Sequence, residues 1–270
     1  LTPASVPIAT AISTDSPFLT EADSTTVRSW IGCIGWLSST CRPDLTCAHS
    51  RISQHMAHPT AAARLAVVHV ARYIKGAADL CLHCSLTHAN TFCFYTDADH
   101  AGNNENQNMR RSQLGWLMTL NGTPILWKST IVSNANCQPD LLEQLPCISV
   151  GEAETYAASN GIMDFMHFSY IADEMHVPHF PSPMVILMDS TVAEAFMKNT
   201  CTKSRMKHID VRQSWVRLIR NCSIAIPSHI DSKSNLADWF TKILQKVHFL
   251  ANRNPLLQKK LQALYPPQHM

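Results

Sequence analysis

Apolar residues recur every three to four positions in the first third of the chain, and this spacing predicts three helices. The first helix covers 27–37. Proline, which is favoured at the first helical position, begins the second helix at Pro43 and the third at Pro59, and the third ends at Gly76. Residues 1–23 are rich in Pro, Ser, Thr and Ala without periodicity, so we expect a linker or tail there.

After the third helix the pattern changes to alternation of apolar and polar residues, which predicts β-strands. Expected strands lie at 80–86, 91–96, 115–120, 124–128 and 184–188. The last of these is apolar throughout and should be buried on both faces. Helical spacing returns at 153–175, 191–199, 208–221 and 235–247. Strands followed by alternating strand and helices predict an α/β fold, a mixed sheet with helices packed over it.

Charge is distributed unevenly along the chain, although the net charge of the 270 residues is only +2. Counting Lys and Arg against Asp and Glu, residues 1–95 carry +1, residues 96–197 carry −9 and residues 198–270 carry +10. An acidic block beside a basic one is typical of a protein that binds a polyanion and needs cations at a carboxylate cluster, and nucleic acid with a divalent metal satisfies both. The alternative is that two solvated faces of opposite charge dock on each other.

Composition argues against several other classes of protein. Hydrophobic content of 46% supports a packed core, and neither G-x-G-x-x-G nor G-x-x-x-x-G-K occurs, so a dinucleotide fold and a P-loop have no support. Ten cysteines are too few for a disulfide scaffold, and the C-x-x-C of Cys81 and Cys84 has no second ligand pair at zinc-finger spacing. Because there is no apolar run long enough for a membrane span and no basic n-region, we expect a protein that is neither membrane-bound nor secreted.

Four carboxylates stand where side chains of different elements can meet. Asp97 and Asp189 each follow an apolar strand directly, which is where open α/β sheets gather active-site residues. Glu154 and Asp238 lie in the first turns of predicted helices, where the helix dipole favours a negative charge, so each has an ordinary structural explanation. Gathered in one crevice, the four would repel one another and take up protons unless cations neutralised them. Mg²⁺ or Mn²⁺ would suit such ligands, and two ions together can promote hydrolysis of a phosphodiester.

The segment 198–220 carries seven basic residues and one acid, Asp210. Such a density of positive charge gives salt-sensitive affinity for phosphates without base recognition. The candidate nucleic-acid contacts are Lys203, Arg205, Lys207, His208 and Arg212. The alternatives are a solvated helix face and, for His208, an anchor for its helix.

Motifs in a characteristic order extend from residue 95 to residue 242. They are 95–102 (YTDADHAG), 124–127 (PILW), 151–159 (GEAETYAAS), 189–190 (DS), 207–212 (KHIDVR) and 236–242 (LADWFTK). This series resembles the ribonuclease H domain of copia-type LTR retrotransposon Pol polyproteins. Upstream, 28–29 (RS), 42–44 (RPD), 50–51 (SR), 59–60 (PT) and 72–76 (RYIKG) resemble the segment that joins reverse transcriptase to ribonuclease H. The polymerase motif Tyr-x-Asp-Asp is absent, so this chain should not polymerise DNA by itself.

The resemblance implies a ribonuclease H-like mixed five-stranded sheet flanked by helices. That domain would cover 77–250, after a helical remnant of the reverse transcriptase connection at 24–76 and before a tail at 251–270. It also implies metal-dependent cleavage of the RNA strand of RNA/DNA hybrids with two Mg²⁺ ions, Mn²⁺ being the other candidate. The implied partners are the hybrid and the remainder of the polyprotein, in a cytoplasmic virus-like particle with access to the nucleus.

By the same resemblance, Asp97 is the first catalytic and metal-binding acid, Asp189 the third and Asp238 the fourth. The second is Glu154 or Glu152. We favour Glu154, which stands in the family's E-x-x-A-A context, whereas Glu152 completes an S-x-x-E capping box with the serine three residues before it. Residues two apart on a helix do not share a face, so both should not reach the same ions.

Two departures from the family and two rival functions stay open. The connection at 128–149 is long and lacks the Lys-Lys-Gln signature, and His100 stands where the family mostly has an aromatic residue. The first rival is a catalytically silent nucleic-acid-binding or scaffold module of a decayed or domesticated retroelement. The second is a transposase or integrase nuclease, although its acids would run Asp, Asp, Glu, whereas here the glutamate precedes the second strand-end aspartate.

Overall fold

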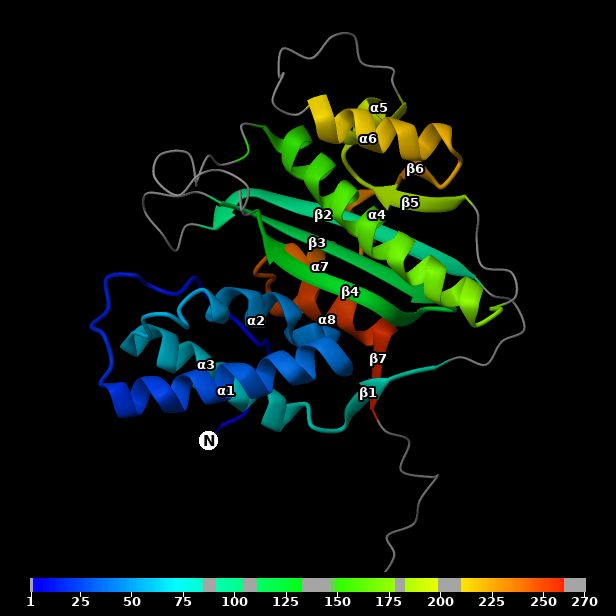
Figure 1. The fold of residues 1–270 in the computed structure, drawn as a ribbon. Helices are drawn as coiled ribbons and strands as arrows, with labels where there is room; N and C mark the ends of the chain where they lie inside the picture. Colours follow the sequence, from blue (N-terminus) through cyan, green and yellow to red (C-terminus); the bar gives the residue numbers. More distant parts are fainter. Residues whose placement is uncertain are drawn as a thin grey trace, which may run out of the picture.

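The fold is that of a computed structural model, which describes residues 2–84, 91–103, 111–132, 147, 149–177, 183–198 and 210–259. A five-stranded sheet lies between two groups of helices (Figure 1). The predicted fold class, α/β with a mixed five-stranded sheet flanked by helices and preceded by a helical segment, is confirmed.

The sheet has the strand order β4-β3-β2-β5-β6. Its strands are β2 (Phe92–Asn103), β3 (Arg111–Leu120), β4 (Thr123–Ile131), β5 (Met184–Met188) and β6 (Ala225–His229). The first three form an antiparallel meander, and β5 and β6 run parallel to β2. Strand β6 was not predicted, because it is short and contains Pro227. A proline is tolerated there because β6 forms the edge of the sheet.

One face of the sheet is covered by the helices that follow the meander. They are α4 (Val150–Glu174), α5 (Thr191–Lys198) and α6 (Asp210–Asn221). Small residues of α4, among them Ala157 and Ala158, are buried in one hydrophobic cluster with Phe94. A Cβ atom at Gly161 would lie 2.9 Å from the Phe94 ring, so glycine lets this helix lie close to the strands.

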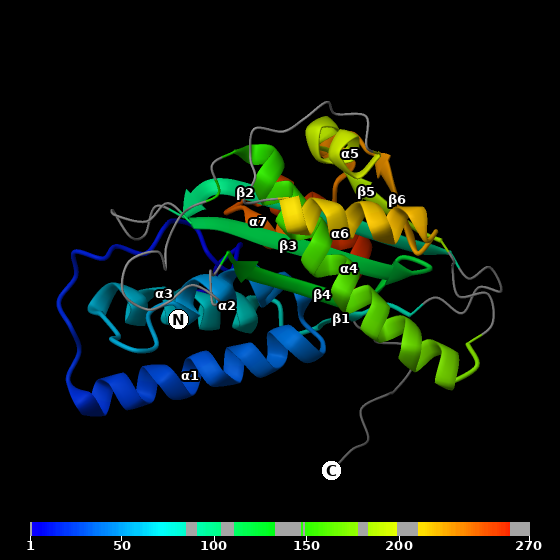
Figure 2. The same cartoon turned by 45° about the horizontal axis from the view of Figure 1, so that its top comes forward.

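The opposite face is covered by both ends of the chain (Figures 1 and 2). Its elements are α1 (Glu21–Thr40), the short 3-10 helix Pro43–Leu45, α2 (Thr46–Ser53), α3 (Ala61–Gly76), α7 (Asp238–Thr241) and α8 (Lys246–Leu256). Val6 and Ile12, in the segment expected to be a linker, are buried in the same core as Leu117 and Phe240. Near the other end, β1 (Leu80–Leu82) pairs with β7 (Leu257–Lys259). The helical segment therefore shares its core with the sheet.

Several predicted elements differ from the structure. The helix expected at 235–247 is two helices, α7 and α8, because the backbone becomes extended at Lys242. Strand β5 is not buried on both faces, since the side chain of Val185 is 44% exposed on the face opposite α4. The strand expected at 80–86 ends at Leu82, and residues 85–86 lie outside the described part of the chain. This strand pairs with β7 instead of joining the main sheet.

Candidate active site

Strand register places the first two acids side by side. The parallel strands β2 and β5 pair at Tyr95 and Leu187, and Asp97 and Asp189 each lie two positions beyond that pair. Residues two apart on a strand point to the same face, so both carboxylates face the same side of the sheet. Asp97 lies inside β2, not at its end as predicted, because pairing with β3 continues beyond it to Asn103. Asp189 directly follows β5, as expected.

Asp238 completes a cluster of three acids. Carboxylate oxygens of Asp97, Asp189 and Asp238 all lie within 4.8 Å of one another. Asp238 is brought there by α7, which lies on β3 directly opposite Asp97: a Cβ atom at Gly115, the cross-strand partner of Asp97, would lie 2.7 Å from the Cβ of Phe240. Three of the four predicted acids are therefore within reach of one cation.

Glu154 approaches the cluster from α4. It lies in the second turn of that helix, not the first as predicted, because the helix begins at Val150. The backbone N–H of Ala98 donates a hydrogen bond to its carboxylate, and its Oε2 atom has no hydrogen-bond partner among the described residues. Burial, followed by the charges of Asp97 and Asp189, raises the pKa of Glu154 to about 9.

Asp97 is also held in an environment that disfavours its charge. It is 1% exposed, and burial raises its pKa to about 7, with the carboxylates of Asp238 and Asp189 acting in the same direction. Lys242 and the hydroxyl of Thr241, which donates a hydrogen bond to Asp97, act against this rise. At neutral pH the cluster therefore favours any cation that can enter it.

The two glutamates near the start of α4 lie in different surroundings. Its side chain caps α4 by accepting a hydrogen bond of 3.2 Å from the backbone N–H of Glu152. This is half of the predicted capping box. Glu152 therefore contributes to the helix end through its backbone, while the charges of Asp97 and Asp189 act on Glu154.

The C-terminal motif supplies residues that sequence reasoning missed. The ammonium of Lys242 pairs with Asp238 and lies 3.5 Å from Asp97 Oδ1. Burial alone would lower the pKa of Lys242, but the carboxylates of Asp97 and Asp238 outweigh it, and the pKa is raised. Spacing of four residues from Asp238 was the signal that could have identified this lysine.

Asn235 is a second missed residue, and it ties the start of the α7 region to the strand that carries Asp97. Its side chain donates to the carbonyl of Thr96 at 3.0 Å and accepts from the N–H of Ala237 at 3.1 Å. Both bonds are buried. The position of Asp238 is therefore fixed from its N-terminal side by one amide side chain.

The predicted nucleic-acid contacts fall largely outside the description. Lys203, Arg205, Lys207 and His208 lie outside the described residues. The backbone of Arg212 belongs to α6, and its side chain is outside the description. Of the long connection at 128–149, the structure describes residues 128–132, Cys147 and Ser149. The Nε2 atom of His100, the other departure from the family, lies 2.7 Å from the carbonyl oxygen of Cys147.

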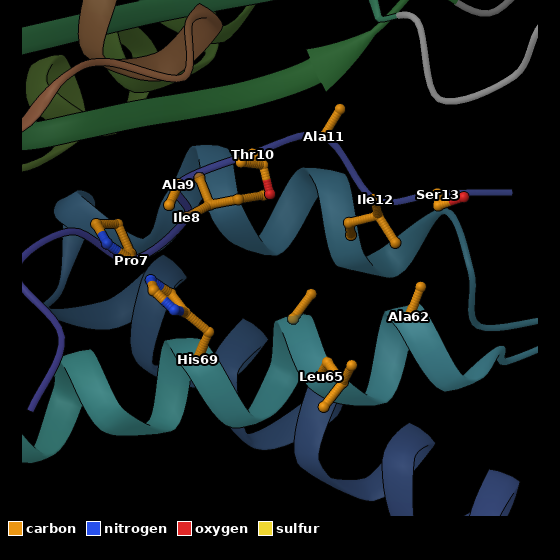
Figure 3. Close-up of a pocket in the computed structure, with 11 residues that line it drawn as sticks. Pro7, Ile8, Ala9, Thr10, Ala11, Ile12, Ser13, Ala62, Leu65 and His69 are labelled. Carbon is orange, nitrogen blue, oxygen red and sulfur yellow. The ribbon is translucent and has the colours of Figure 1, made fainter. Parts of the chain in front are cut away.

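A separate hollow of about 330 Å³ lies between the N-terminal segment and α3 (Figure 3). Residues 7–13 cross over Ala62, Leu65 and His69. The His69 ring makes a hydrogen bond of 3.0 Å with the carbonyl of Val6. None of the four acids lines this hollow, so it is not the candidate active site.

The strand order and the acidic cluster define a ribonuclease H-like domain. No protein-family model matches the chain. Among solved structures, ribonuclease H1 isolated from compost by a metagenomic approach aligns with a TM-score of 0.41 and 17% identity, covering 57% of this chain and 94% of that one. The same enzyme in complex with an RNA/DNA hybrid aligns with a TM-score of 0.39 and 14% identity, covering 56% and 94%.

Sequence relatives include Pol polyproteins of plant transposons. The retrovirus-related Pol polyprotein from transposon TNT 1-94 of Nicotiana tabacum is 28% identical over 82% of this chain, and that from transposon RE2 of Arabidopsis thaliana is 29% identical over 90%. The chain spans 15% and 16% of their lengths. Secreted RxLR effector protein 161 of Plasmopara viticola is 34% identical over 37% of this chain and 69% of that protein. The relatives that match most of the chain are retrovirus-related Pol polyproteins of transposons, which supports the resemblance that the motifs indicated.

No helix in the described part of the chain combines the length and apolarity that a membrane span requires.

Proposed function

We propose that this domain cleaves the RNA strand of RNA/DNA hybrids in a reaction that depends on divalent metal. One observation carries the proposal: carboxylate oxygens of Asp97, Asp189 and Asp238 lie within 4.8 Å of one another, and Glu154 is buried beside them. Acids from four separate elements meet although burial and mutual repulsion oppose their charges. Such an arrangement is expected where a cation supplies the missing stabilisation.

The donor set fits magnesium or manganese. All of its atoms are carboxylate oxygens, which these ions prefer, and Glu154 Oε2 has no other partner in the described structure. Asp97, Glu154, Asp189 and Asp238 would hold two ions. When bound, the ions would activate a water and stabilise the leaving oxygen of the phosphodiester.

The chain's own residues fix the orientation of the ligands. The hydroxyl of Thr241 donates a hydrogen bond to one carboxylate oxygen of Asp97, and the other oxygen faces Lys242. The N–H of Ala98 holds the Glu154 carboxylate in the same way. Oriented ligands of this kind reduce the reorganisation that binding and reaction require. Lys242 adds positive charge beside the position where a phosphate would lie.

The substrate class is supported by the Pol polyprotein relatives and by the basic segment at 198–220. Phosphate contacts from Lys203, Arg205, Lys207, His208 and Arg212 would supply affinity that does not depend on sequence. Contacts to 2′-hydroxyls would distinguish the RNA strand. We further propose that the remainder of the polyprotein is a partner and that the domain works in a cytoplasmic virus-like particle with access to the nucleus.

The direct test is cleavage of an end-labelled RNA/DNA hybrid in Mg²⁺ by the wild-type chain, Asp97→Asn and Asp173→Asn. Asp173 is an exposed acid at the far end of α4, so it is the matched control. We expect Asp97→Asn to lose activity by about 10³-fold or more, because a ligand of the ions is worth several kcal/mol. Asp173→Asn should cleave like the wild type. Equal, negligible cleavage by all three would favour the silent binding module, and cleavage of duplex DNA would revive the transposase or integrase nuclease.

Binding to the hybrid is tested by its salt dependence. Changing Lys203, Arg205 and Lys207 together to Ala should reduce the slope of log affinity against log salt by about 2 to 3, since each phosphate contact contributes about 0.9 to that slope in a duplex. The triple change of Arg64, Arg72 and Lys75 on α3 removes the same charge from the helical segment. If both triple variants keep the wild-type slope, the nucleic acid lies elsewhere.

A further inference from the structure

Helix α7 is too short to fix the position of Asp238 by itself. It contains four residues, Asp238–Thr241, and a helix of one turn is unstable in water without tertiary contacts. The last carbonyls of any helix lack partners within the helix. The contacts that these carbonyls make therefore decide where α7 lies.

Three consecutive carbonyls at the end of α7 accept hydrogen bonds from side chains of other elements. Ser129 of β4 donates to the carbonyl of Phe240, and Arg51 of α2 donates to that of Thr241 at 3.3 Å. The thiol of Cys47, also on α2, is 3.9 Å from the carbonyl of Lys242. Two of the three donors thus come from α2, in the helical segment that precedes the sheet.

Arg51 is the central contact. Its side chain is buried, with 1% of the residue exposed, although it carries a full positive charge. A terminal nitrogen, Nη2, lies 3.3 Å from the Thr241 carbonyl and 3.8 Å from Asp99 Oδ2. A cation at a helix C-terminus stabilises the helix, and the effect is larger where water is excluded. The guanidinium therefore joins α2, β2 and α7 beside the acidic cluster.

A second connection runs from α2 through the sheet. Ser50 accepts a hydrogen bond of 2.8 Å from the side-chain amide of Gln113 on β3, and the same nitrogen donates to Ser129 at 2.8 Å. Ser129 in turn donates to the end of α7. Adjacent residues of α2 thus reach α7 by two routes, one direct and one through two strands.

We propose that Arg51 is a positioning residue for the acidic cluster, so that the helical segment at 21–76 completes the active site of the sheet domain. Displacing the end of α7 would move Asp238, Thr241 and Lys242 together, and all three contact the cluster around Asp97. Within the described part of the chain, Arg51 bonds or pairs with Thr241 and Asp99 and with none of the four acids. The effect of Arg51 on cleavage rests on the proposed function, whereas its effect on the position of α7 does not.

The test compares Arg51→Met with Arg42→Met in the full chain. Arg42 is the matched control, because it is a buried arginine of the same segment whose partners are Asp44 and the carbonyl of Ala77, not α7. Amide hydrogen exchange of the peptide covering 238–245 should rise about tenfold or more in Arg51→Met, since a buried hydrogen bond to a charged donor is lost. In Arg42→Met it should stay within about threefold of the wild type, although that variant loses a buried ion pair.

Magnesium affinity, measured by calorimetry without substrate, supplies the second readout. We expect Arg51→Met to bind Mg²⁺ about tenfold more weakly, because three side chains of the cluster shift with α7. Arg51→Lys keeps the charge and one donor, so it should restore most of the affinity. Arg51→Gln is shorter and uncharged, so it replaces Arg51→Met if that variant does not fold. Cleavage of the hybrid should follow the order of the affinities.

The outcomes separate the two proposals. If the wild type does not cleave the hybrid but Arg51→Met still raises exchange at α7, the proposed function fails and the positioning role stands. If Arg51→Met, or Arg51→Gln in its place, leaves both α7 exchange and Mg²⁺ affinity within about threefold of the wild type, the positioning role is overturned. An equal rise of α7 exchange in Arg42→Met would overturn it as well, because the effect would then be global loss of stability.

Discussion

Helices α4 and α7 each deliver one acid to the same cluster, but they are positioned in different ways. Helix α4 has 25 residues, a serine cap and a stripe of small residues that packs on the sheet, so Glu154 is carried by an element that its own sequence specifies. Helix α7 has four residues, and contacts with Asn235, Ser129, Arg51 and Gly115 fix its position. An active site can thus combine one acid set by local sequence with another set almost entirely by tertiary contacts.

Because the two helices are held differently, Glu154 and Asp238 should respond to different substitutions. Glu154 should tolerate changes in the helical segment, because α4 lies on the opposite face of the sheet. Asp238 should respond to changes at Arg51, which lies 190 positions before its hydrogen-bond partner Thr241 in the chain. Perturbations on the two faces therefore have distinguishable effects on one site.

The largest expected effect tests the acid on α4. Glu154→Gln keeps the size of the side chain but removes its charge, so hybrid cleavage in Mg²⁺ should fall by about 10³-fold, as for loss of a metal ligand worth several kcal/mol. Glu152→Gln, two residues earlier on the same helix, is the matched control. The backbone N–H of Glu152 donates to the capping side chain of Ser149, and glutamine keeps that N–H, so the cleavage rate of Glu152→Gln should stay within about threefold of the wild type.

The pair of variants decides between the two glutamates. A loss in Glu152→Gln as large as that in Glu154→Gln would mean that both carboxylates take part. A loss in Glu152→Gln alone would exchange their assignments. In either case thermal unfolding of both variants should be compared first, because both residues are buried.

Elements with strong local signals could be predicted from the sequence. Thr60 and Gly76 bound α3 close to the expected positions, since capping and helix termination depend on nearby residues. Asp189 directly follows β5 as expected, and three of the four predicted acids do meet. Periodicity and motif order were sufficient for these features because each depends on a few neighbouring residues or on strand register.

The remaining features depend on contacts between distant residues. The break between α7 and α8 arises where Thr241 and Lys242 turn toward Asp97, 144 positions earlier in the case of Thr241, and apolar spacing contains no sign of it. Asn235 and Arg51 act through backbone carbonyls, which any residue offers. The sequence therefore does not show which carbonyls they bind, and these contacts are seen only in the fold.

Another prediction concerns how the stability of the metal-free protein depends on pH, to which both Glu154 and Asp97 contribute. Burial raises the folded-state pKa of Glu154 from 4.5 to about 9 and that of Asp97 from 3.8 to about 7. Between those ordinary values and the raised ones, the folded state binds more protons than the unfolded state, so the free energy of unfolding should fall as pH rises from about 4 to about 9. The loss should be on the order of a few kcal/mol, measured by urea denaturation in a chelator.

Glu154→Gln and added Mg²⁺ sharpen this prediction. Glu154→Gln has no carboxylate to titrate, so its stability should fall less steeply above pH 7 than that of the wild type or Glu152→Gln. Mg²⁺ binds the ionised carboxylates, so the stabilisation it provides should increase with pH. Unfolding free energies that rise with pH in the chelator would show that the cluster does not form without metal.

The smallest expected effect comes from a substitution that tests the contact between α7 and β3. A methyl group at Gly115 would lie 2.7 Å from the Cβ of Phe240 and 2.8 Å from Cγ2 of Thr241, so Gly115→Ala must push α7 away from β3. Overpacking of this kind costs about 1 to 3 kcal/mol, which exceeds the few tenths gained from a less flexible unfolded chain. Urea denaturation should therefore show a loss of stability, and Mg²⁺ affinity should fall with it because Asp238 moves.

Gly32→Ala is the matched control for that change. Gly32 lies in the interior of α1, and an added methyl group would meet no atom within 4 Å. Alanine is favoured over glycine in a helix by about 0.8 to 1 kcal/mol, so this variant should be more stable than the wild type, with unchanged Mg²⁺ affinity. Opposite signs for the two substitutions would show that α7 rests directly on the strand beside Asp97. If Gly115→Ala matched the wild type in both stability and Mg²⁺ affinity, α7 would not be held there, and the contrast between the two helices would lose its structural basis.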